Sequence, residues 1–210
     1  MSTDVDVFFD PVCPWAWITS RWVEEVAAQR GLAVHWRFLS LRLLNAGRDY
    51  ATYFPAGYAE GHTLGLRLLR VAAATRDVAG DEGVARLYRE LGRRIHRPGA
   101  GLMELPDGGL EEALAAAELP GGLAAAQDDD RYDAVVAEET RLAVERAGDD
   151  VGTPVVTFAA PDGPSFFGPV ISRVPKGQEA VELWDATERL ARFPGFAELK
   201  RAVREQPQFP

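Results

Sequence analysis

The sequence predicts an α/β fold in which a strand–helix–strand unit and a strand–strand–helix unit are separated by an all-helical block. Three observations support this prediction: alternating apolar residues flank one helical stretch before residue 40, helical periodicity fills the middle, and alternation returns after residue 149. A length of 210 residues, 47% hydrophobic and 26% charged, suits a soluble globular domain with one large insertion. We expect residues 1–45 and 149–210 to form the sheet-containing domain and residues 46–148 the helical insertion.

The first unit begins with an alternating run at residues 5–9, which is typical of a strand. Pro14 then suits the first position of a helix, because proline loses no helical hydrogen bond there. Apolar residues at helical spacing continue to Val26, and Gly31 is placed to end the helix. A second alternating run, residues 34–38, completes the unit. Two strands joined by one helix are expected to be parallel.

The middle of the chain carries helical patterns only, and glycine and proline separate them. We expect helices at about residues 58–75, 81–97, 109–118 and 131–147. Gly80 and the pair at residues 98–99 are two of the breaks between them. No repeat is present, so the block is predicted to be an insertion rather than an array of repeats.

The last unit begins with an apolar, β-branched run at residues 154–158. A turn at residues 161–164 separates it from a partner strand at residues 165–168, which predicts an antiparallel hairpin. An amphipathic helix follows at about residues 176–193. Strand–helix–strand, helices, then strand–strand–helix is the order of a thioredoxin-like sheet that carries a helical insertion.

Charge and cysteine content exclude several classes of function. A formal net charge of −9 with no basic run argues against nucleic acid and against an anionic membrane surface as partners. No apolar stretch approaches the roughly 18 residues of a membrane helix, and the N-terminus lacks the features of a signal peptide. The single cysteine cannot form an intrachain disulfide. These observations predict a cytoplasmic location.

Cys13 is the main candidate for chemistry, because it follows a predicted strand and begins a predicted helix. The partial positive charge at a helix N-terminus favours a thiolate, which is the nucleophile of thiol–disulfide exchange. The first helical residue after it is Pro14, and Trp15 comes next. The alternative is a buried, inert cysteine. The strand–turn–helix placement favours the reactive interpretation.

Pro154 is the second candidate, because it opens a predicted strand where proline removes a hydrogen-bond donor. A cis bond after Thr153, facing a site, would explain it, and an ordinary trans proline is the equally weighted alternative. The histidines have no metal-ligand spacing and no second cysteine to complete a zinc site, so we expect no metal. We predict structural roles for His35, His62 and His96.

Several segments, taken together, resemble DsbA-like proteins, and most closely the actinobacterial mycothiol-dependent nitroreductases. The similarity runs nearly from end to end. It is carried by residues 9–17 (FDPVCPWAW), 17–22, Leu44–Asn45, Tyr58 with Glu60–Gly61, 94–96, 150–154, 166–170 and 207–209.

The resemblance implies a thioredoxin fold whose helical insertion forms a lid over the active site. It implies that Thr153–Pro154 is a cis-proline loop facing Cys13. By position in the matching segments, Trp15, Asn45 and Tyr58 would line the substrate pocket between the sheet and the lid, as would Pro14 and Thr153–Pro154. Mycothiol or another low-molecular-weight thiol would be the co-substrate, with no tightly bound cofactor. The oligomeric state stays open, with a homodimer as one option.

Ala16 departs from the family pattern, which has a resolving cysteine at this position. Without that thiol, Cys13 cannot close an intramolecular disulfide, and a dithiol cycle is not available. A monothiol cycle remains: Cys13 forms a mixed disulfide with a small thiol, and a second small thiol releases it. The sequence leaves open whether Ala16 is natural or introduced.

The sequence therefore indicates a mycothiol-linked thiol oxidoreductase that acts on a disulfide, a nitro compound or another electrophile. Two alternatives stay open. One is a thiol transferase or isomerase like the kappa-class glutathione transferases, with hydroxyls available on Thr19, Ser20 and Tyr58. The other is a pocket protein that binds ligands without turnover, and Ala16 is the feature that favours it.

Overall fold

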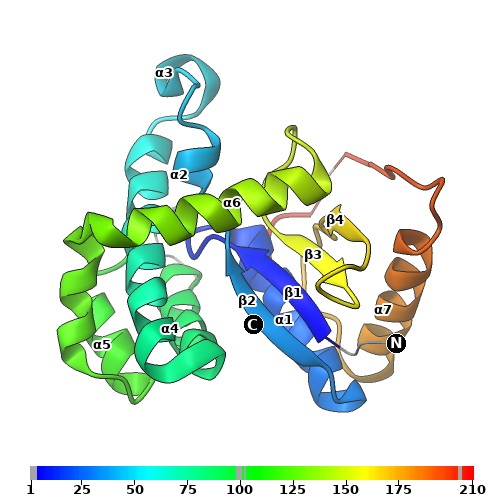
Figure 1. Ribbon diagram of the computed structural model, residues 1–210, viewed down its shortest axis with the longest axis horizontal. Helices are drawn as coiled ribbons and strands as arrows, with labels where there is room; N and C mark the ends of the chain where they lie inside the picture. The colour runs from blue at the N-terminus through cyan, green and yellow to red at the C-terminus, as the bar shows by residue number, and fades with distance from the viewer. Residues whose placement is uncertain (1–3, 98–100, 102, 203–204) are drawn as a thin grey trace.

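A computed structural model describes residues 4–97, 101, 103–202 and 205–210. Its centre is a four-stranded sheet with the strand order β2–β1–β3–β4 (Figure 1). The strands are β1 (Asp4–Phe9), β2 (Ala33–Phe38), β3 (Val155–Phe158) and β4 (Ser165–Phe167). β1 runs parallel to β2 and antiparallel to β3, and β3 pairs with β4 as an antiparallel hairpin. Both predicted units are therefore present, joined through β1 and β3.

Helices cover both faces of the sheet and build a lobe beside it (Figure 1). The α-helices are α1 (Pro14–Arg30), α2 (Leu41–Leu44), α3 (Tyr50–Tyr53), α4 (Tyr58–Ile95), α5 (Gly109–Ala116), α6 (Asp133–Ala147) and α7 (Gly177–Ala191), and the 3₁₀ helices are η1 (Gly121–Asp128) and η2 (Asp130–Tyr132). α1 and α7 pack together on one face, where the indole N–H of Trp22 donates to the Ala180 carbonyl at 2.9 Å. α6 crosses the other face, and α4 and α5 form the lobe. No helix in the described ranges has the length and apolar character that crossing a bilayer requires.

α1 begins and ends where the sequence predicts. Cys13 is its N-cap residue, Pro14 takes the first helical position, and Gly31 ends the helix with a φ of 66°. This left-handed conformation carries little cost for glycine and is common directly after a helix. The position of Cys13 at the start of the helix therefore follows from local sequence.

The helical insertion differs from the prediction in one main respect. The two helices expected at residues 58–75 and 81–97 are one continuous helix, α4, with a kink at Gly80 (φ 63°, ψ −166°). Gly80 adopts the non-helical backbone angles of the kink, and the chain is helical on both sides of it instead of ending in a loop. Three short helices, α2, α3 and η1, were not predicted, and the expected break at residues 98–99 lies outside the described residues.

A buried ion-pair group attaches the insertion to the sheet. The carboxylate of Glu139 on α6 accepts a hydrogen bond from the backbone N–H of Phe38 at 2.7 Å. The same carboxylate accepts from Nη1 of Arg76 on α4 at 2.7 Å, and Arg37 of β2 lies 3.3 Å away. Glu139 is buried, so these partners replace the water that its charge would otherwise require. α4, α6 and β2 are thereby held together.

Candidate active site around Cys13

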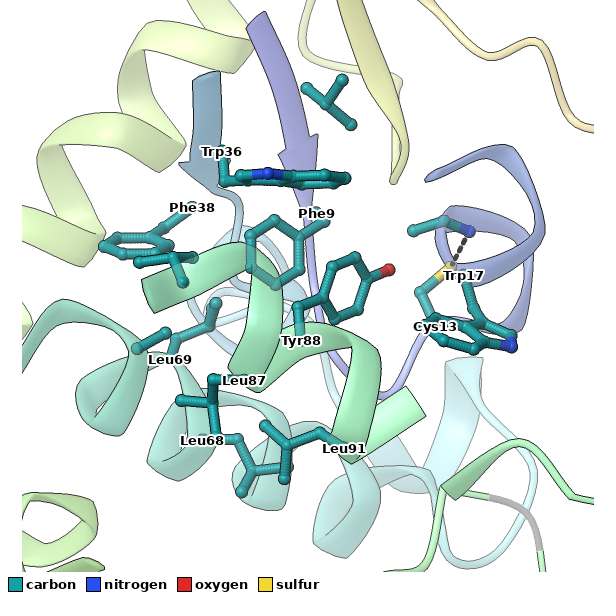
Figure 2. Packing of buried hydrophobic residues seen from close by; sticks show 14 of the residues in the cluster. Phe9, Cys13, Trp17, Trp36, Phe38, Leu68, Leu69, Leu87, Tyr88 and Leu91 are labelled. Atoms are coloured by element: carbon teal, nitrogen blue, oxygen red, sulfur yellow. Dashed lines mark hydrogen bonds between the residues drawn. The ribbon is translucent and has the colours of Figure 1, made fainter. Parts of the chain in front are cut away.

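The loop between β1 and α1 presents Cys13 at the carboxyl end of a central strand. β1 ends at Phe9, and the backbone N–H of Cys13 donates to the carbonyl of Asp10 at 3.0 Å, which closes a tight turn. The Cys13 Sγ then accepts from the backbone N–H of Ala16 at 3.5 Å, as an N-cap side chain does. Figure 2 shows this sulfur beside the indole of Trp17. The turn and the cap together fix where the sulfur points.

Thr153 approaches the sulfur from the other half of the chain. The Cys13 thiol donates to the Thr153 carbonyl oxygen at 3.4 Å, across 140 residues of sequence. The Thr153–Pro154 peptide bond is cis, the first of the two alternatives that the sequence left open. The Oγ1 atom of Thr153 is buried and has no hydrogen-bond partner among the described residues. A backbone carbonyl and an unpaired hydroxyl therefore lie next to the thiol.

Burial decides the protonation of Cys13 in this structure. The residue is only 5% exposed, and burial raises the pKa of its thiol above the ordinary value. The N–H of Ala16 at the helix start acts in the opposite direction but does not outweigh burial. The N–H groups at the helix start lower the thiol pKa, as the sequence predicts, but burial has the larger effect and the net pKa is raised. The helix start contributes the backbone N–H groups of Ala16 and Trp15 to the sulfur, whereas burial removes nearly all of the water around it.

An aromatic cluster packs behind the loop. The Tyr88 ring stacks on Phe9 with centroids 4.0 Å apart and meets Trp17 edge-on at 5.6 Å. In Figure 2 the Tyr88 hydroxyl points to the side on which Cys13 lies. The buried guanidinium of Arg21 lies over Trp17, 4.3 Å from the ring centroid. This packing makes the floor of the site rigid and largely apolar.

Asn45 and Tyr58 lie on elements that surround the loop, and no hydrogen bond or ring contact joins either of them to Cys13 in the described structure. The backbone N–H of Trp15, in contrast, interacts with the Cys13 sulfur and lowers the pKa of the thiol. Asn45 is buried at the end of α2, where its side-chain amide donates to the Leu41 carbonyl at 2.8 Å. Tyr58, at the start of α4, packs its ring against His62 at 5.6 Å. Trp15 is half-buried against the main hydrophobic cluster. The structure thus brings Thr153 and the backbone of Trp15 to Cys13, while Asn45 and Tyr58 keep local partners.

Asp10 is a site residue that sequence reasoning did not single out. It is fully buried directly before the cysteine loop, and its carboxylate accepts the backbone N–H groups of Val12 at 3.1 Å and Leu41 at 2.8 Å. Burial raises its pKa to about 7. The sequence feature that could have identified it is an aspartate between a predicted strand and Pro11, because an aspartate side chain at such a turn can accept a backbone N–H two residues later.

Two histidines are buried within the structure, as their predicted structural roles require. Nε2 of His96 lies 2.9 Å from the Pro11 carbonyl, and its ring stacks on Trp17 at 5.9 Å. His62 is hydrogen-bonded to the Tyr50 hydroxyl at 3.0 Å. Burial lowers the pKa of each to about 4, so both are neutral at pH 7. In the part of the chain that is described, no group of three His, Cys, Asp or Glu residues is arranged to hold a metal ion.

Two surface hollows border the helical insertion, and the larger one is also lined by Phe38 of β2. One, of about 520 Å³, is bounded by α4, η2 and α6, and the other, of about 340 Å³, lies along the first turns of α4. Neither is lined by Cys13 or Thr153. Cys13 itself is buried in the described conformation.

Comparison with known proteins gives a family match over most of the chain. Residues 12–201 match the family described as the Rv2466c-like mycothiol-dependent nitroreductases. The sequence is also 32% identical over 207 residues to Rv2286c, an uncharacterized protein of Mycobacterium tuberculosis, covering 95% of this chain and 82% of that one.

Solved structures give the fold. The cytosolic disulfide reductase DsbM from Pseudomonas aeruginosa aligns with a TM-score of 0.57 at 19% identity, covering 90% of this chain and all of that one. SCO1869 from Streptomyces coelicolor, described as a probable DsbA oxidoreductase, aligns with a TM-score of 0.56 at 16% identity over 99% of both chains. The predicted thioredoxin-like fold with a helical insertion is confirmed by the sheet order and by these neighbours.

Proposed function

Because the chain belongs to the Rv2466c-like family of mycothiol-dependent nitroreductases, we propose that it is a cytoplasmic monothiol oxidoreductase that uses mycothiol or a similar small thiol. Cys13 is the nucleophile in this proposal. Pro14, Trp15, Asn45, Tyr58, Thr153 and Pro154 form the surroundings in which the small thiol and its acceptor bind. The helical insertion, residues 46–148, acts as a lid over them.

The observation that carries the proposal is the placement of the Cys13 sulfur between a helix start and the backbone of Thr153. The sulfur accepts from the Ala16 N–H at 3.5 Å and lies 3.4 Å from the Thr153 carbonyl. Backbone groups at an edge like this can align an incoming disulfide against the thiolate by extended hydrogen bonding. The absence of any other cysteine leaves no second protein thiol for the cycle.

The proposed cycle balances without a second protein cysteine. The Cys13 thiolate attacks one sulfur of a disulfide, forms a new S–S bond and releases the other half as a thiolate. A second small thiolate then attacks the sulfur of the small thiol in the mixed disulfide and restores Cys13. With a nitro acceptor, two small thiols supply two electrons and two protons, and the products are a nitroso compound, water and one small-molecule disulfide.

Burial of Cys13 requires that the site opens before this chemistry. At 5% exposure the thiol is largely inaccessible in the described conformation, and burial, which raises its pKa, disfavours its ionisation. Movement of the insertion relative to the sheet would admit water and lower the thiol pKa. Hydrogen exchange in residues 58–95 is expected to change when a small thiol is added, and unchanged exchange would count against a moving lid.

The same burial favours one alternative, a pocket protein that binds a thiol without turnover. The transferase alternative has less support, because the hydroxyls of Thr19 and Ser20 already donate to the backbone carbonyls of Pro169 and Trp17, both at 2.7 Å. Thr19 and Ser20 are both fully buried in the described structure, so neither hydroxyl is available to activate a bound thiol.

Intact mass spectrometry after exposure to mycothiol disulfide tests the proposal. The wild-type protein is expected to gain the mass of one mycothiol, and Cys13→Ser is expected to gain none. Ala16→Cys restores a resolving thiol, so its adduct should be lost with formation of an internal disulfide. Binding of mycothiol without any covalent adduct would select the pocket-protein alternative.

A further inference from the structure

Asp10 connects the cysteine loop to the entrance of the helical insertion. One carboxylate oxygen accepts the N–H of Val12 at 3.1 Å, one residue before Cys13. The other accepts the N–H of Leu41 at 2.8 Å, the first residue of α2. Both acceptor oxygens are therefore used by backbone groups from two segments that are 29 residues apart (41 − 12 = 29). Through them, the turn that aims the thiol is fixed to the chain entering the insertion.

α4 closes over the same carboxylate. A side chain at Gly65 would overlap Oδ1 of Asp10, so only glycine permits the helix to pass this closely. The contact excludes water and leaves the Asp10 side chain fully buried. The Asp10 carboxylate is thus surrounded by the cysteine loop, α2 and α4, with the N–H groups of Val12 and Leu41 as its only polar partners in the described structure.

No cation neutralises Asp10 in the described part of the chain. Of the titratable groups around it, Cys13 on its own loop and Tyr88 on α4 each carry a raised pKa to which the Asp10 charge contributes, after burial. His96 at the end of α4 is neutral at pH 7. Arg42 of α2 lies instead over the Tyr50 ring, 4.9 Å from its centroid. Two groups that are negative when ionised, Asp10 and Cys13, therefore share one buried volume without a counter-ion.

We propose that Asp10 is the positioning residue of this site: its carboxylate holds the cysteine loop against α2, and its negative charge opposes the Cys13 thiolate. A thiolate at Cys13 is then favoured when Asp10 is protonated, and the two groups ionise as a coupled pair. A buried carboxyl that titrates near pH 7 places this coupling in the physiological range. The proposal rests on the proposed role of Cys13 as nucleophile, but the coupling itself can be measured without turnover.

The test is the rate of Cys13 alkylation by iodoacetamide from pH 5 to pH 10, followed by intact mass. The single cysteine makes each adduct unambiguous. In the wild-type protein, the plot of alkylation rate against pH should show a shoulder near pH 7, where Asp10 ionises. Asp10→Asn should show one rise displaced to lower pH. Its alkylation should be about twofold faster than wild type at pH 7, where half of Asp10 is already protonated, and should approach about tenfold faster above pH 8, which is the change that one unit of thiol pKa makes.

Asp6→Asn is the matched control. Asp6 is also a buried aspartate of β1, but its carboxylate is paired with Arg146 at 2.8 Å and with Arg37 at 3.6 Å. Asp6→Asn should lower the melting temperature and leave the pH dependence of Cys13 alkylation unchanged. Equal profiles for wild type and Asp10→Asn would overturn the proposal, because a merely structural aspartate changes stability without moving the thiol titration.

A second measurement does not depend on the folding of a variant. The carboxyl ¹³C signal of Asp10 in wild-type protein should titrate near pH 7. Titration in the usual aspartate range, near pH 4, would contradict the proposal. If the coupling is found but no mixed disulfide forms with mycothiol disulfide, the proposed function fails while the role of Asp10 stands.

Discussion

Nε2 of His96 donates a hydrogen bond to the carbonyl oxygen of Pro11 at 2.9 Å, which joins the last turn of α4 to the loop that carries Cys13. A carbonyl only accepts hydrogen bonds, so the neutral ring must carry its proton on Nε2. Trp17 stacks on one side of this ring, and Phe209 near the C-terminus lies 5.4 Å from it. The helical insertion, the cysteine loop and the chain end therefore meet at a single histidine.

We expect His96 to make the fold labile in acid. Burial lowers its pKa from 6.5 to about 4, so the unfolded state takes up a proton more readily. The stabilising contribution is complete above pH 6.5 and is lost as the pH falls toward 4, with a size on the order of 3 kcal/mol. Urea denaturation at pH 7 and pH 5 measures it.

His96→Gln keeps an N–H donor for Pro11 but does not titrate, so it should lack the part of the stability loss between pH 7 and pH 5 that protonation of His96 causes. Asp10 acts in the opposite direction: its pKa is raised from 3.8 to about 7, so its contribution decreases as the pH rises through that window. The difference between wild type and His96→Gln isolates the histidine. If wild type and His96→Gln differed by the same free energy of unfolding at pH 7 and at pH 5, His96 would not be a source of the acid lability.

Phe209 is expected to hold the chain end against the site. It is half-buried on the main hydrophobic cluster, and the backbone N–H of Gln208 donates to the Ser172 carbonyl at 2.7 Å. Phe209→Ala should lower stability by about 1–2 kcal/mol and speed alkylation of Cys13 by loosening His96. Phe193→Ala, at a position 64% exposed, is the matched control and should change neither. Equal effects from both variants would rule out a specific contact.

Gly92 allows Trp17 to pack against α4. A side chain at this position would overlap the six-membered ring of the Trp17 indole, so Gly92→Ala must displace it. We expect a loss of about 1–3 kcal/mol from overpacking, together with a shift in tryptophan fluorescence. Gly122→Ala, where a side chain would meet nothing within 4 Å, is the control. If Gly92→Ala matched this control in stability and in fluorescence, the close packing would be disproved.

Glu139 is expected to be the main polar attachment of the insertion. Glu139→Ala leaves the Phe38 N–H, Arg76 and Arg37 without their shared acceptor. Removing one partner of a buried ion pair costs about 3–5 kcal/mol. Glu138→Ala removes a neighbouring carboxylate whose side chain is 64% exposed, and it should cost little. Chemical denaturation compares the free energies of unfolding of the two variants. Similar losses of stability would show that Glu139 is not the main polar attachment of the insertion.

The sequence was sufficient for the β1–β2 unit, the β3–β4 hairpin and the start of α1, because local signals set all three, whereas the pairing of β1 with β3 was not predicted from either segment. Alternating apolar residues located β1 and β2, and Pro14 with Gly31 located the ends of the helix between them. The kinked α4 was missed because Gly80 has the same local signal whether a helix ends or bends there. α2 and α3, of four residues each, are too short to show a helical period.

The environment of the site could not be obtained from local sequence, because it depends on burial by distant segments. The helix start at Cys13 indicated a thiolate, yet the packing that covers the sulfur raises its pKa. Asp10 acquires its raised pKa only when α2 and α4 close over it. The proximity of Thr153 to Cys13 came from family resemblance and not from the pattern of either segment.

The central claim, a monothiol cycle at Cys13, is tested most directly by following a preformed mixed disulfide. Wild-type protein carrying one mycothiol on Cys13 is mixed with free mycothiol, and protein mass and small-molecule disulfide are measured together over time. We predict that the protein returns to its free mass while one equivalent of mycothiol disulfide appears. A mixed disulfide that persists in excess mycothiol, or that cannot be formed at all, would contradict the account.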